Sequence, residues 1–336
     1  MLSRTIHAIL FEILIFSLLV LGAGICLLPG YLPFLKWGTN FAVQIMLTYL
    51  LLGIIFLVIK KYRLVFLCFG CCAVLSLYLK FSSQTGHKRK LSALFSAQKP
   101  PAGKSISLKV ALFNTANADR EANRTIAILK GAGADLLTMQ EVTPPWAALL
   151  SDSLKDIYPF RQIMVDMGMQ GMAIFSKKEI LSVDTFYYQN LPNLVLGIAL
   201  DEGCEKLFFV SSHMYPVLDQ SSYRGFKGHL RTIENHLSKI DDPVIVLGEY
   251  NAVSWSNEIQ EFRKKTKLQD SRRGFMPSFS DGSVSFTDIP LDHIFFSHHF
   301  QCKNFVTLRS KSSNHLGIMG SYQIKIPTNN DSIPLQ

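Results

Sequence analysis

Acidic, amide and histidine side chains lie at the ends of apolar, strand-like segments at six places in the chain, and such side chains can bind metals and phosphate. In the stretch PVIVLGEYNAVSWS, residues 243–256, an apolar run ends at Glu249 and Asn251. A polar residue at a single strand end most often forms a turn. Six such sites in one chain favour a shared crevice, because strand ends line the ligand sites of layered α/β folds. The other five sites hold Asn114, Glu141, His213, Asp292 and the pair Asn314-His315.

The hydrophobic pattern predicts the elements that must position these residues. Apolar residues at helical spacing predict amphipathic helices, and runs rich in β-branched and aromatic residues predict strands. Several strands follow one another without an intervening helix, which favours two mixed β-sheets packed face to face with helices outside them. The predicted fold class is therefore α/β (α+β type), a four-layer α/β sandwich. The predicted strands are residues 107–115, 135–142, 171–177, 193–200, 206–213, 243–251, 291–297 and 321–326, and the predicted helices are 120–131, 146–157, 223–240 and 257–265.

Eight short motifs follow one another between Leu108 and Ile326: FNTAN, DLLTMQEV, GMAIFSK, VSSHMYP, VIVLGEYNA, DSRRG, IPLDHIFFS and SSNHLG. Their order resembles the pattern of the endonuclease/exonuclease/phosphatase superfamily, in its membrane-tethered bacterial branch. The resemblance implies two mixed sheets flanked by helices, in agreement with the predicted elements. It also implies a hydrolase that uses a divalent metal, usually Mg²⁺ with Mn²⁺ as a substitute, to cleave a phosphodiester or a phosphomonoester.

The resemblance also assigns a metal site. It makes Glu141 the principal metal ligand, with Asn114 supporting the metal or its waters. One or two side chains suffice for Mg²⁺, because this hard cation prefers oxygen ligands, keeps several waters and holds substrate phosphate as well. The bound cation would neutralise charge that develops on the phosphoryl group.

The same resemblance gives five residues catalytic roles. His315, oriented by Asp292, would contact the phosphate or assist proton transfer, since a carboxylate fixes the tautomer of an imidazole and raises its pKa. His213 matches the second histidine of the deoxyribonuclease and sphingomyelinase branches, which helps to protonate the leaving oxygen. Asn251 would donate to the phosphate, and Glu249 would orient or deprotonate the attacking water.

The chain departs from the family pattern in two places. Glu249 stands where the family usually has Asp, and Asn314 stands where it usually has the Asp of Ser-Asp-His, a residue that contacts the metal in some members. The first change moves a carboxylate by one methylene, and a misplacement of about 1 Å can cost about 100-fold in rate. The second removes a negative charge and should weaken metal binding. The alternative is therefore a degenerate domain of the same fold that binds a phosphorylated ligand or a protein partner without turnover.

The N-terminal part of the chain is apolar. Residues 6–28, 41–59 and 64–79 form three runs close to the length that crosses a bilayer, which predicts three transmembrane helices. The predicted organisation is a membrane region (1–80), a basic flexible tether (81–106), the catalytic domain (107–328) and a disordered tail (329–336). The lipid bilayer is thus a predicted partner.

Charge is distributed unevenly. Residues 1–80 carry six basic and one acidic residue (+5), residues 81–106 add five basic residues (+5), and the remainder has 23 basic and 24 acidic residues (−1). The nearly neutral domain argues against a strong duplex-DNA surface, because such binding rests on phosphate neutralisation. Lipid headgroups, soluble phosphoesters and nucleic acid remain open as substrates, with the first two favoured.

The sidedness of the membrane region follows from its basic residues. Arg4 and the KKYR turn (60–63) favour a cytoplasmic N-terminus. We therefore expect an integral protein of a bacterial inner membrane whose domain is periplasmic. The HKRK cluster (87–90) favours the opposite orientation.

Other polar or aromatic residues have structural interpretations. His293 should point away from Asp292 on an alternating strand, the pair His298-His299 lacks a neighbouring carboxylate, and Trp255 is expected to pack the loop after its strand. A disulfide between Cys204 and Cys302 is left open.

Overall fold

The computed structural model describes residues 2–28, 33–83, 105–116, 122–200, 206–280, 285–309 and 313–325. Most of the predicted tether, the predicted tail and Cys204 lie outside these residues, so the predictions made for them are not addressed. At the two edges of the tether, helix α4 continues to Ser83 and strand β1 begins at Ser105.

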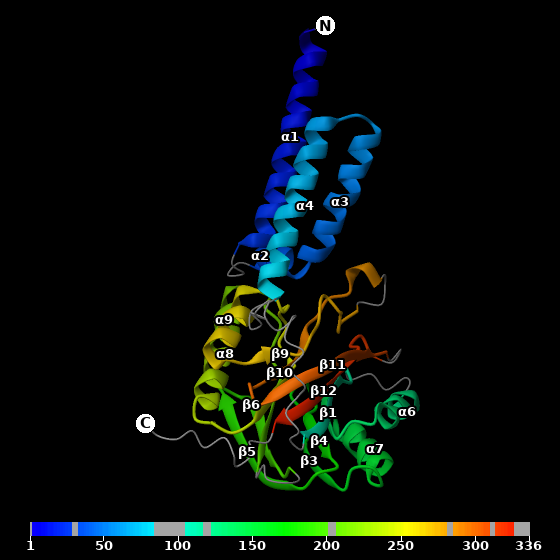
Figure 1. Ribbon diagram of the computed structural model, residues 1–336, viewed down its shortest axis with the longest axis vertical. Coiled ribbons are helices and arrows are strands. Elements are labelled where there is room, and N and C mark those ends of the chain that lie inside the picture. Colours follow the sequence, from blue (N-terminus) through cyan, green and yellow to red (C-terminus); the bar gives the residue numbers. More distant parts are fainter. Residues whose placement is uncertain are drawn as a thin grey trace.

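The N-terminal helices form a bundle on one end of the domain (Figure 1). Two of its helices contain segments long and apolar enough to cross a membrane, Leu10–Leu27 and Tyr62–Ser82. The prediction of three transmembrane helices is corrected to two such segments, because residues 41 and 59 of the middle apolar run lie outside the helix. The remaining 17 residues extend only about 26 Å, against a hydrocarbon core of about 30 Å. The helices are α1 (Leu2–Leu27), α2 (Pro33–Asn40), α3 (Ala42–Val58) and α4 (Tyr62–Ser83).

Two six-stranded mixed sheets make up the domain, which confirms the predicted fold class. The first has the strand order β11-β12-β1-β2-β4-β3, and the second has the order β5-β6-β7-β8-β10-β9. Each contains one parallel pair, β1 with β2 and β7 with β8. The first sheet consists of β1 (Ser105–Asn114), β2 (Leu136–Gln140), β3 (Phe160–Met164), β4 (Met172–Ser176), β11 (Phe300–Leu308) and β12 (Gly317–Lys325). The second consists of β5 (Ile180–Tyr188), β6 (Leu191–Ile198), β7 (Leu207–Ser212), β8 (Val244–Glu249), β9 (Gln269–Asp270) and β10 (Asp292–Phe296).

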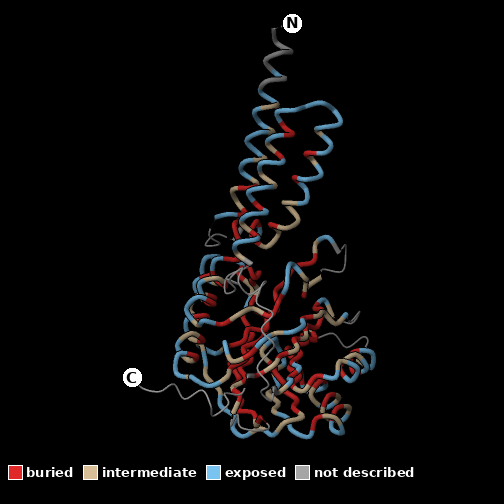
Figure 2. The backbone as a smooth tube through the Cα atoms, viewed as in Figure 1, coloured by how far each residue is buried: buried red, intermediate tan, exposed pale blue. Residues whose placement is uncertain are grey.

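A dry core lies between the sheets, and helices cover their outer faces. Leu112, Ile174, Leu196, Leu247 and Ile294 belong to the inner cluster, and Figure 2 shows buried residues concentrated within the domain. Burial of apolar surface is the main term that holds such layers together. Helices α6 (Ala122–Ala132) and α7 (Pro144–Leu154) pack on the first sheet, and α8 (Gln220–Leu237) and α9 (Asn257–Thr266) pack on the second.

Helix α8 carries a histidine on its buried face. His229 is 1 % exposed, its Nε2 lies 2.8 Å from Asn193 Oδ1, and its ring stacks on Tyr188. Asn193 donates from Nδ2 to the carbonyl of Phe186, which turns its Oδ1 towards the imidazole. Burial, with a smaller contribution from the charge of His213, lowers the pKa of His229 to about 4.

The buried His229 should make the fold sensitive to acid. Its unfolded imidazole binds a proton below about pH 6.5 whereas the folded one does so only below about pH 4, so stability falls as the pH drops through this window. The difference is worth about 3 kcal/mol. We expect His229→Gln to reduce the acid-induced fall in the thermal unfolding midpoint of the full chain between pH 7 and pH 4.5. The exposed control His298→Gln should leave the fall unchanged, and equal falls in all three proteins would contradict the prediction.

Candidate active site

Two side chains of the site come from the ends of the parallel strands β1 and β2. Asn114 is the last residue of β1 and stands opposite Gln140, the last residue of β2. Glu141 follows with a left-handed backbone (φ +58°) that non-glycine residues seldom adopt. Asn114 Nδ2 donates to Glu141 Oε1 at 3.0 Å. The first sheet thus presents a carboxylate and an amide at one of its edges.

The second sheet contributes three more residues at the matching edge. Glu249 ends β8, Asp292 begins the antiparallel neighbour β10 directly opposite it, and His213 follows β7. Gly248 is required just before Glu249, since a Cβ there would lie 1.7 Å from the carbonyl oxygen of Ser212 and its φ is +147°. Glycine therefore allows the backbone at the end of β8 to approach the backbone at the end of β7 closely.

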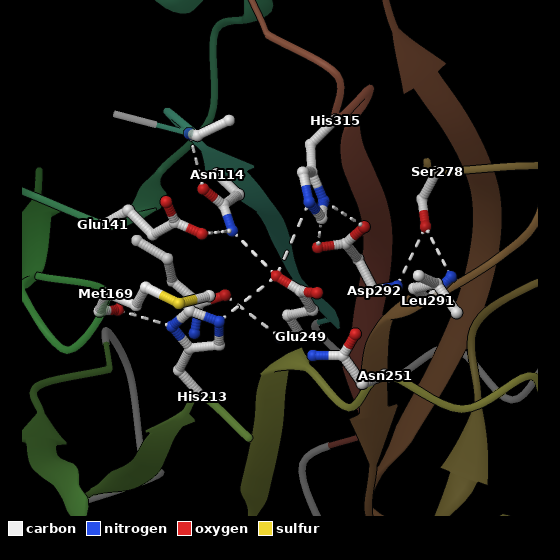
Figure 3. Close-up of polar contacts among 12 residues, drawn as sticks. Asn114, Glu141, Met169, His213, Glu249, Asn251, Ser278, Leu291, Asp292 and His315 are labelled. Atoms are coloured by element: carbon white, nitrogen blue, oxygen red, sulfur yellow. Dashed lines mark hydrogen bonds and ion pairs between the residues drawn. The ribbon is translucent and has the colours of Figure 1, made fainter. Parts of the chain in front are cut away.

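His315 reaches the same place from the segment before β12. The hydroxyl of Ser313 donates to the carbonyl of Asn114 and accepts from the backbone N–H of His315. Because β12 pairs antiparallel with β1, this segment begins beside the end of β1. Figure 3 shows His315 facing Glu249 and Asp292 across the gap between the sheets.

One oxygen of Glu249 is the hub of the cluster. Its Oε2 lies 2.8 Å from Asn114 Nδ2, 3.2 Å from His213 Nε2 and 3.6 Å from His315 Nε2. The carboxylate is buried, and buried charge is tolerated when it is paired and hydrogen-bonded. The glutamate that departs from the family pattern is thus fully engaged in the site.

Each histidine is held by a second partner at its other nitrogen. His315 Nδ1 lies 3.0 Å and 3.2 Å from the two carboxylate oxygens of Asp292. His213 Nδ1 donates to the carbonyl of Met169 at 2.7 Å, which leaves Nε2 facing Glu249. Such outer partners fix the orientation of a reactive imidazole.

The carboxylates set the protonation of both rings. Burial by itself would lower the pKa of His315, but Asp292 and Glu249 outweigh it and raise the pKa to about 9. Burial likewise opposes protonation of His213, and its contact with Glu249 raises the pKa above the ordinary value. Burial would raise the pKa of Glu249, but His315 and His213 hold it below the usual range. The pKa values of both histidines are therefore raised and that of the carboxylate between them is lowered, and His315 is an imidazolium at neutral pH.

The two remaining predicted residues lie at the edge of the cluster. Asn251 has a left-handed backbone (φ +50°) and donates from Nδ2 to the carbonyl of Met214 at 2.7 Å. Asn314 is exposed, and its carbonyl accepts from the N–H of Ser280. Among the described residues, the geometry brings Asn114, Glu141, His213, Glu249, Asp292 and His315 together, whereas the Asn314 side chain has no hydrogen bond to them.

Several residues that the sequence did not single out hold the site. Gln140 bridges the sheets, because its Nε2 donates to the carbonyl of Ser212 and its Oε1 accepts from the N–H of Glu249. Ser278 Oγ accepts from the N–H groups of Leu291 and Asp292. Gln140 ends a buried strand just before Glu141, the predicted metal ligand. An amide side chain at the end of a buried strand is the sequence signal that could have pointed to it.

The residues given structural interpretations have structural contacts. His293 Nε2 donates to the carbonyl of Ala252 and its Nδ1 lies 3.4 Å from Asp270, away from the cluster. His299 contacts Ser297 at a turn. Trp255 is buried and packs against both its own loop and the helical bundle.

The donor set of the cluster suits a hard divalent cation. Ligand atoms of Glu141, His213 and Glu249 lie within 4.8 Å of one another, and so do those of Glu249, Asp292 and His315. The second group is satisfied internally, since its imidazole lies between two carboxylates. Glu141 engages Asn114 through one carboxylate oxygen and turns the other away (Figure 3). An oxygen ligand of this kind, with waters and substrate oxygens, fits Mg²⁺.

The chain belongs to the Endonuclease/Exonuclease/phosphatase family, whose sequence model matches residues 111–315. This confirms the resemblance at the level of the superfamily, whose members hydrolyse phosphoester bonds, while its membrane-tethered branch stays a prediction. The matched residues run from β1 to His315 and include all six members of the cluster. A comparison with curated proteins gives no match.

Solved structures share the fold at low sequence identity. An endonuclease/exonuclease/phosphatase from Bacteroides vulgatus superposes with a TM-score of 0.56 and 16% identity, covering 66% of this chain and 100% of its own. Mannosyl-6-phosphatase from Bacteroides thetaiotaomicron gives 0.52 and 19%, covering 64% and 99%. Sphingomyelinase C from Streptomyces griseocarneus gives 0.50 and 16%, covering 64% and 99%. These likenesses establish the fold and leave the substrate to be argued from the site.

Proposed function

We propose that the protein is a membrane-anchored, divalent-metal-dependent phosphoesterase that hydrolyses a phosphodiester or a phosphomonoester. The observation that carries the proposal is the convergence of Glu141, His213, Glu249, Asp292 and His315 from both sheets into one hydrogen-bonded cluster. Mg²⁺, with Mn²⁺ as a substitute, would be held by Glu141 with support from Asn114, and it would supply charge neutralisation at the phosphoryl group.

The two histidines supply protons and positive charge. With a pKa of about 9, His315 is an imidazolium at neutral pH, so it can donate a hydrogen bond to a phosphoryl oxygen as negative charge develops there. His213, also with a raised pKa, can give its Nε2 proton to the leaving oxygen. Asp292 and the Met169 carbonyl keep these rings oriented through the step.

The two roles open to Glu249 are distinguished by its charge state. A carboxylate whose pKa is held low by two neighbouring histidines is a weak base. We therefore assign Glu249 to orienting the attacking water and to raising the pKa of both histidines. Asn251, with one amide hydrogen on Met214, has a second hydrogen for a phosphoryl oxygen.

The membrane part of the proposal rests on two apolar segments, Leu10–Leu27 and Tyr62–Ser82. Lys61 pairs with Glu12 at 3.3 Å, so the KKYR turn lies beside α1 at the end of the bundle far from the domain (Figure 1). Basic residues at that end support a cytoplasmic N-terminus. Figure 1 shows the shorter helix α3 leading the chain back to that end between the two segments, so the N-terminus and the domain lie at opposite ends of the bundle. We therefore place the protein in a bacterial inner membrane with the catalytic domain in the periplasm.

Hydrolysis of bis(p-nitrophenyl) phosphate and of p-nitrophenyl phosphate by the purified full chain tests the proposed function. We expect release of p-nitrophenol from at least one of them with Mg²⁺ and none with EDTA. Saturable binding of the ester without product would instead support the catalytically degenerate alternative, in which the domain only binds a phosphorylated ligand or a protein partner.

A further inference from the structure

The helical bundle is docked on the loop that follows β8. Trp255 Nε1 donates to the carbonyl of Thr39 at 2.7 Å, and the hydroxyl of Tyr78 donates to the carbonyl of Trp255 at 2.9 Å. The Trp255 side chain is 1 % exposed and belongs to one apolar cluster with bundle residues, among them Leu75 and Leu79. Hydrogen bonds in both directions around a buried tryptophan define the placement of this loop.

A second loop, the one that precedes β10, is docked in the same way. Gln44 Nε2, near the start of α3, donates to the carbonyl of Asp288 at 3.0 Å. Ile289 and Leu291 are buried in the same cluster as Trp255. The bundle therefore contacts both the segment that follows β8 and the segment that precedes the adjacent strand β10.

Helix α2 adds a third contact. Lys36 is 4 % exposed, and its Nζ lies over the ring of Phe226 on α8, 4.5 Å from the centroid. A desolvated lysine above an aromatic face contributes a cation–π attraction. This contact lies on α8, one of the helices outside the second sheet, so three separate contacts join the bundle to the domain.

The docked loops also carry the catalytic groups. Trp255 follows Asn251 by four residues, and Asp288 precedes Asp292 by four. Four residues of chain span at most about 15 Å. Phe279, which packs on the bundle cluster, meets the ring of His315 edge-on with centroids 5.1 Å apart. The active site therefore lies within about 15 Å of the domain-facing end of the bundle.

That end of the bundle marks one surface of the bilayer. The first candidate membrane segment ends there at Leu27, and the second ends there at Ser82 (Figure 1). The headgroup layer beyond the hydrocarbon core is only about 5–8 Å thick. A site within roughly 15 Å of the helix ends lies close to the depth of lipid phosphates.

Exposed aromatic side chains lie at the same level. Trp37 on α2 is 66 % exposed, and Phe286 on the short 3-10 helix η1 (Ser285–Thr287) is 49 % exposed. Phe275, which contacts Trp255 edge-on, is 39 % exposed. Aromatic residues are enriched at membrane–water interfaces. The bilayer surface is the partner that fits them, because the membrane segments end beside them.

We propose that the docked bundle holds the active site at the bilayer surface and that the substrate is the phosphoester of a membrane lipid whose acyl chains stay in the bilayer. This inference rests on the proposed function, and it selects one substrate class among those left open by it. Trp37 and Phe286 enter the headgroup layer and bring the site to the lipid phosphates.

The test compares a lipid with a soluble substrate for the same protein preparation. The full chain is reconstituted into vesicles of phosphatidylethanolamine, phosphatidylglycerol and sphingomyelin, and released headgroup is measured beside hydrolysis of bis(p-nitrophenyl) phosphate. The variants are Trp37→Asp and Phe286→Asp, with Phe160→Asp as control. Phe160 is an exposed phenylalanine on β3, at the opposite end of the domain (Figure 1).

We expect Trp37→Asp and Phe286→Asp each to lower lipid hydrolysis roughly tenfold, because a charged side chain opposes insertion into the membrane–water interface. Soluble hydrolysis should stay within about twofold, and Phe160→Asp should change neither rate. If the wild type hydrolyses the soluble ester but no lipid, the inference is overturned and the proposed function stands. The same follows if Trp37→Asp and Phe286→Asp lose activity equally on both substrates. Absence of both activities in the wild type would refute the proposed function itself.

Discussion

Replacing His315 with alanine should lower phosphodiester hydrolysis by the full chain about a thousandfold, within the range for losing a preorganised donor to a developing negative charge. The structure places this ring between two carboxylates, with Nδ1 3.0 Å from Asp292 and Nε2 3.6 Å from Glu249. Alanine removes the imidazolium, so the buried Asp292 loses its histidine partner and Glu249 keeps only His213. The exposed His298→Ala is the matched control and should retain the wild-type rate.

The pH profile separates a chemical role of His315 from a structural one. Its pKa of about 9 means that activity dependent on the protonated ring is present at neutral pH and is lost as the pH rises through about 9. Asp292→Asn removes a charge that raises this pKa, so the alkaline limb should move to lower pH. An unchanged alkaline limb in Asp292→Asn, or a full rate in His315→Ala, would contradict the role assigned to this histidine.

Replacing Glu249 with glutamine should lower the rate by at least about a hundredfold, since the buried cluster would lose the charge on which two histidines and Asn114 converge. Glutamine is nearly isosteric, so the loss reports charge more than shape. The alkaline limb of the rate should also shift to lower pH, because Glu249 helps to raise the pKa of His315.

Glu249→Asp tests whether the cluster is fitted to the longer side chain. Aspartate is the residue that the family usually has at this position. In the structure Glu249 Oε2 already meets three partners, and shortening the side chain would withdraw it from them. We expect a loss of about tenfold or more. A gain in rate, measured on the same phosphodiester, would show that glutamate is a poorer fit than the contacts indicate.

The strand-end residues were predictable because their positions follow from topology. Asn114 ends β1, Glu141 follows the end of the parallel neighbour β2, and Asp292 faces Glu249 across an antiparallel pair. Residues far apart in sequence therefore had to meet at one edge. The exposed position of Asn314 was not predictable, since it depends on how Ser313 and His315 anchor the segment to β1.

Other parts of the fold left a weak sequence signal. Strands β3, β5 and β11 were missed because they lie at or near sheet edges and alternate poorly, as the largely exposed β5 shows. Strand β9 has only two residues. Gln140 and Met169 act through a bridging amide and a backbone carbonyl, and neither contact follows from residue type.

The relation between the bundle and the domain is the largest feature that the sequence did not reveal. Trp255, Gln44 and Lys36 form a specific interface between the two parts that no sequence pattern indicated. Trp255 was expected to pack its own loop, and its second partner, Thr39, is more than two hundred residues away in the chain. Contacts of this kind depend on the folded arrangement of both parts.

The dependence of phosphodiester hydrolysis on Mg²⁺ concentration, measured for the full chain and for Glu141→Ala after both have been stripped with EDTA, tests the central claim most directly. The wild-type rate should rise from background and saturate, because we propose that Glu141 holds the cation at the end of β2. The variant should stay near background throughout the titration. Equal curves for the two proteins, or a wild-type rate that EDTA does not change, would contradict a metal-dependent phosphoesterase site built around Glu141.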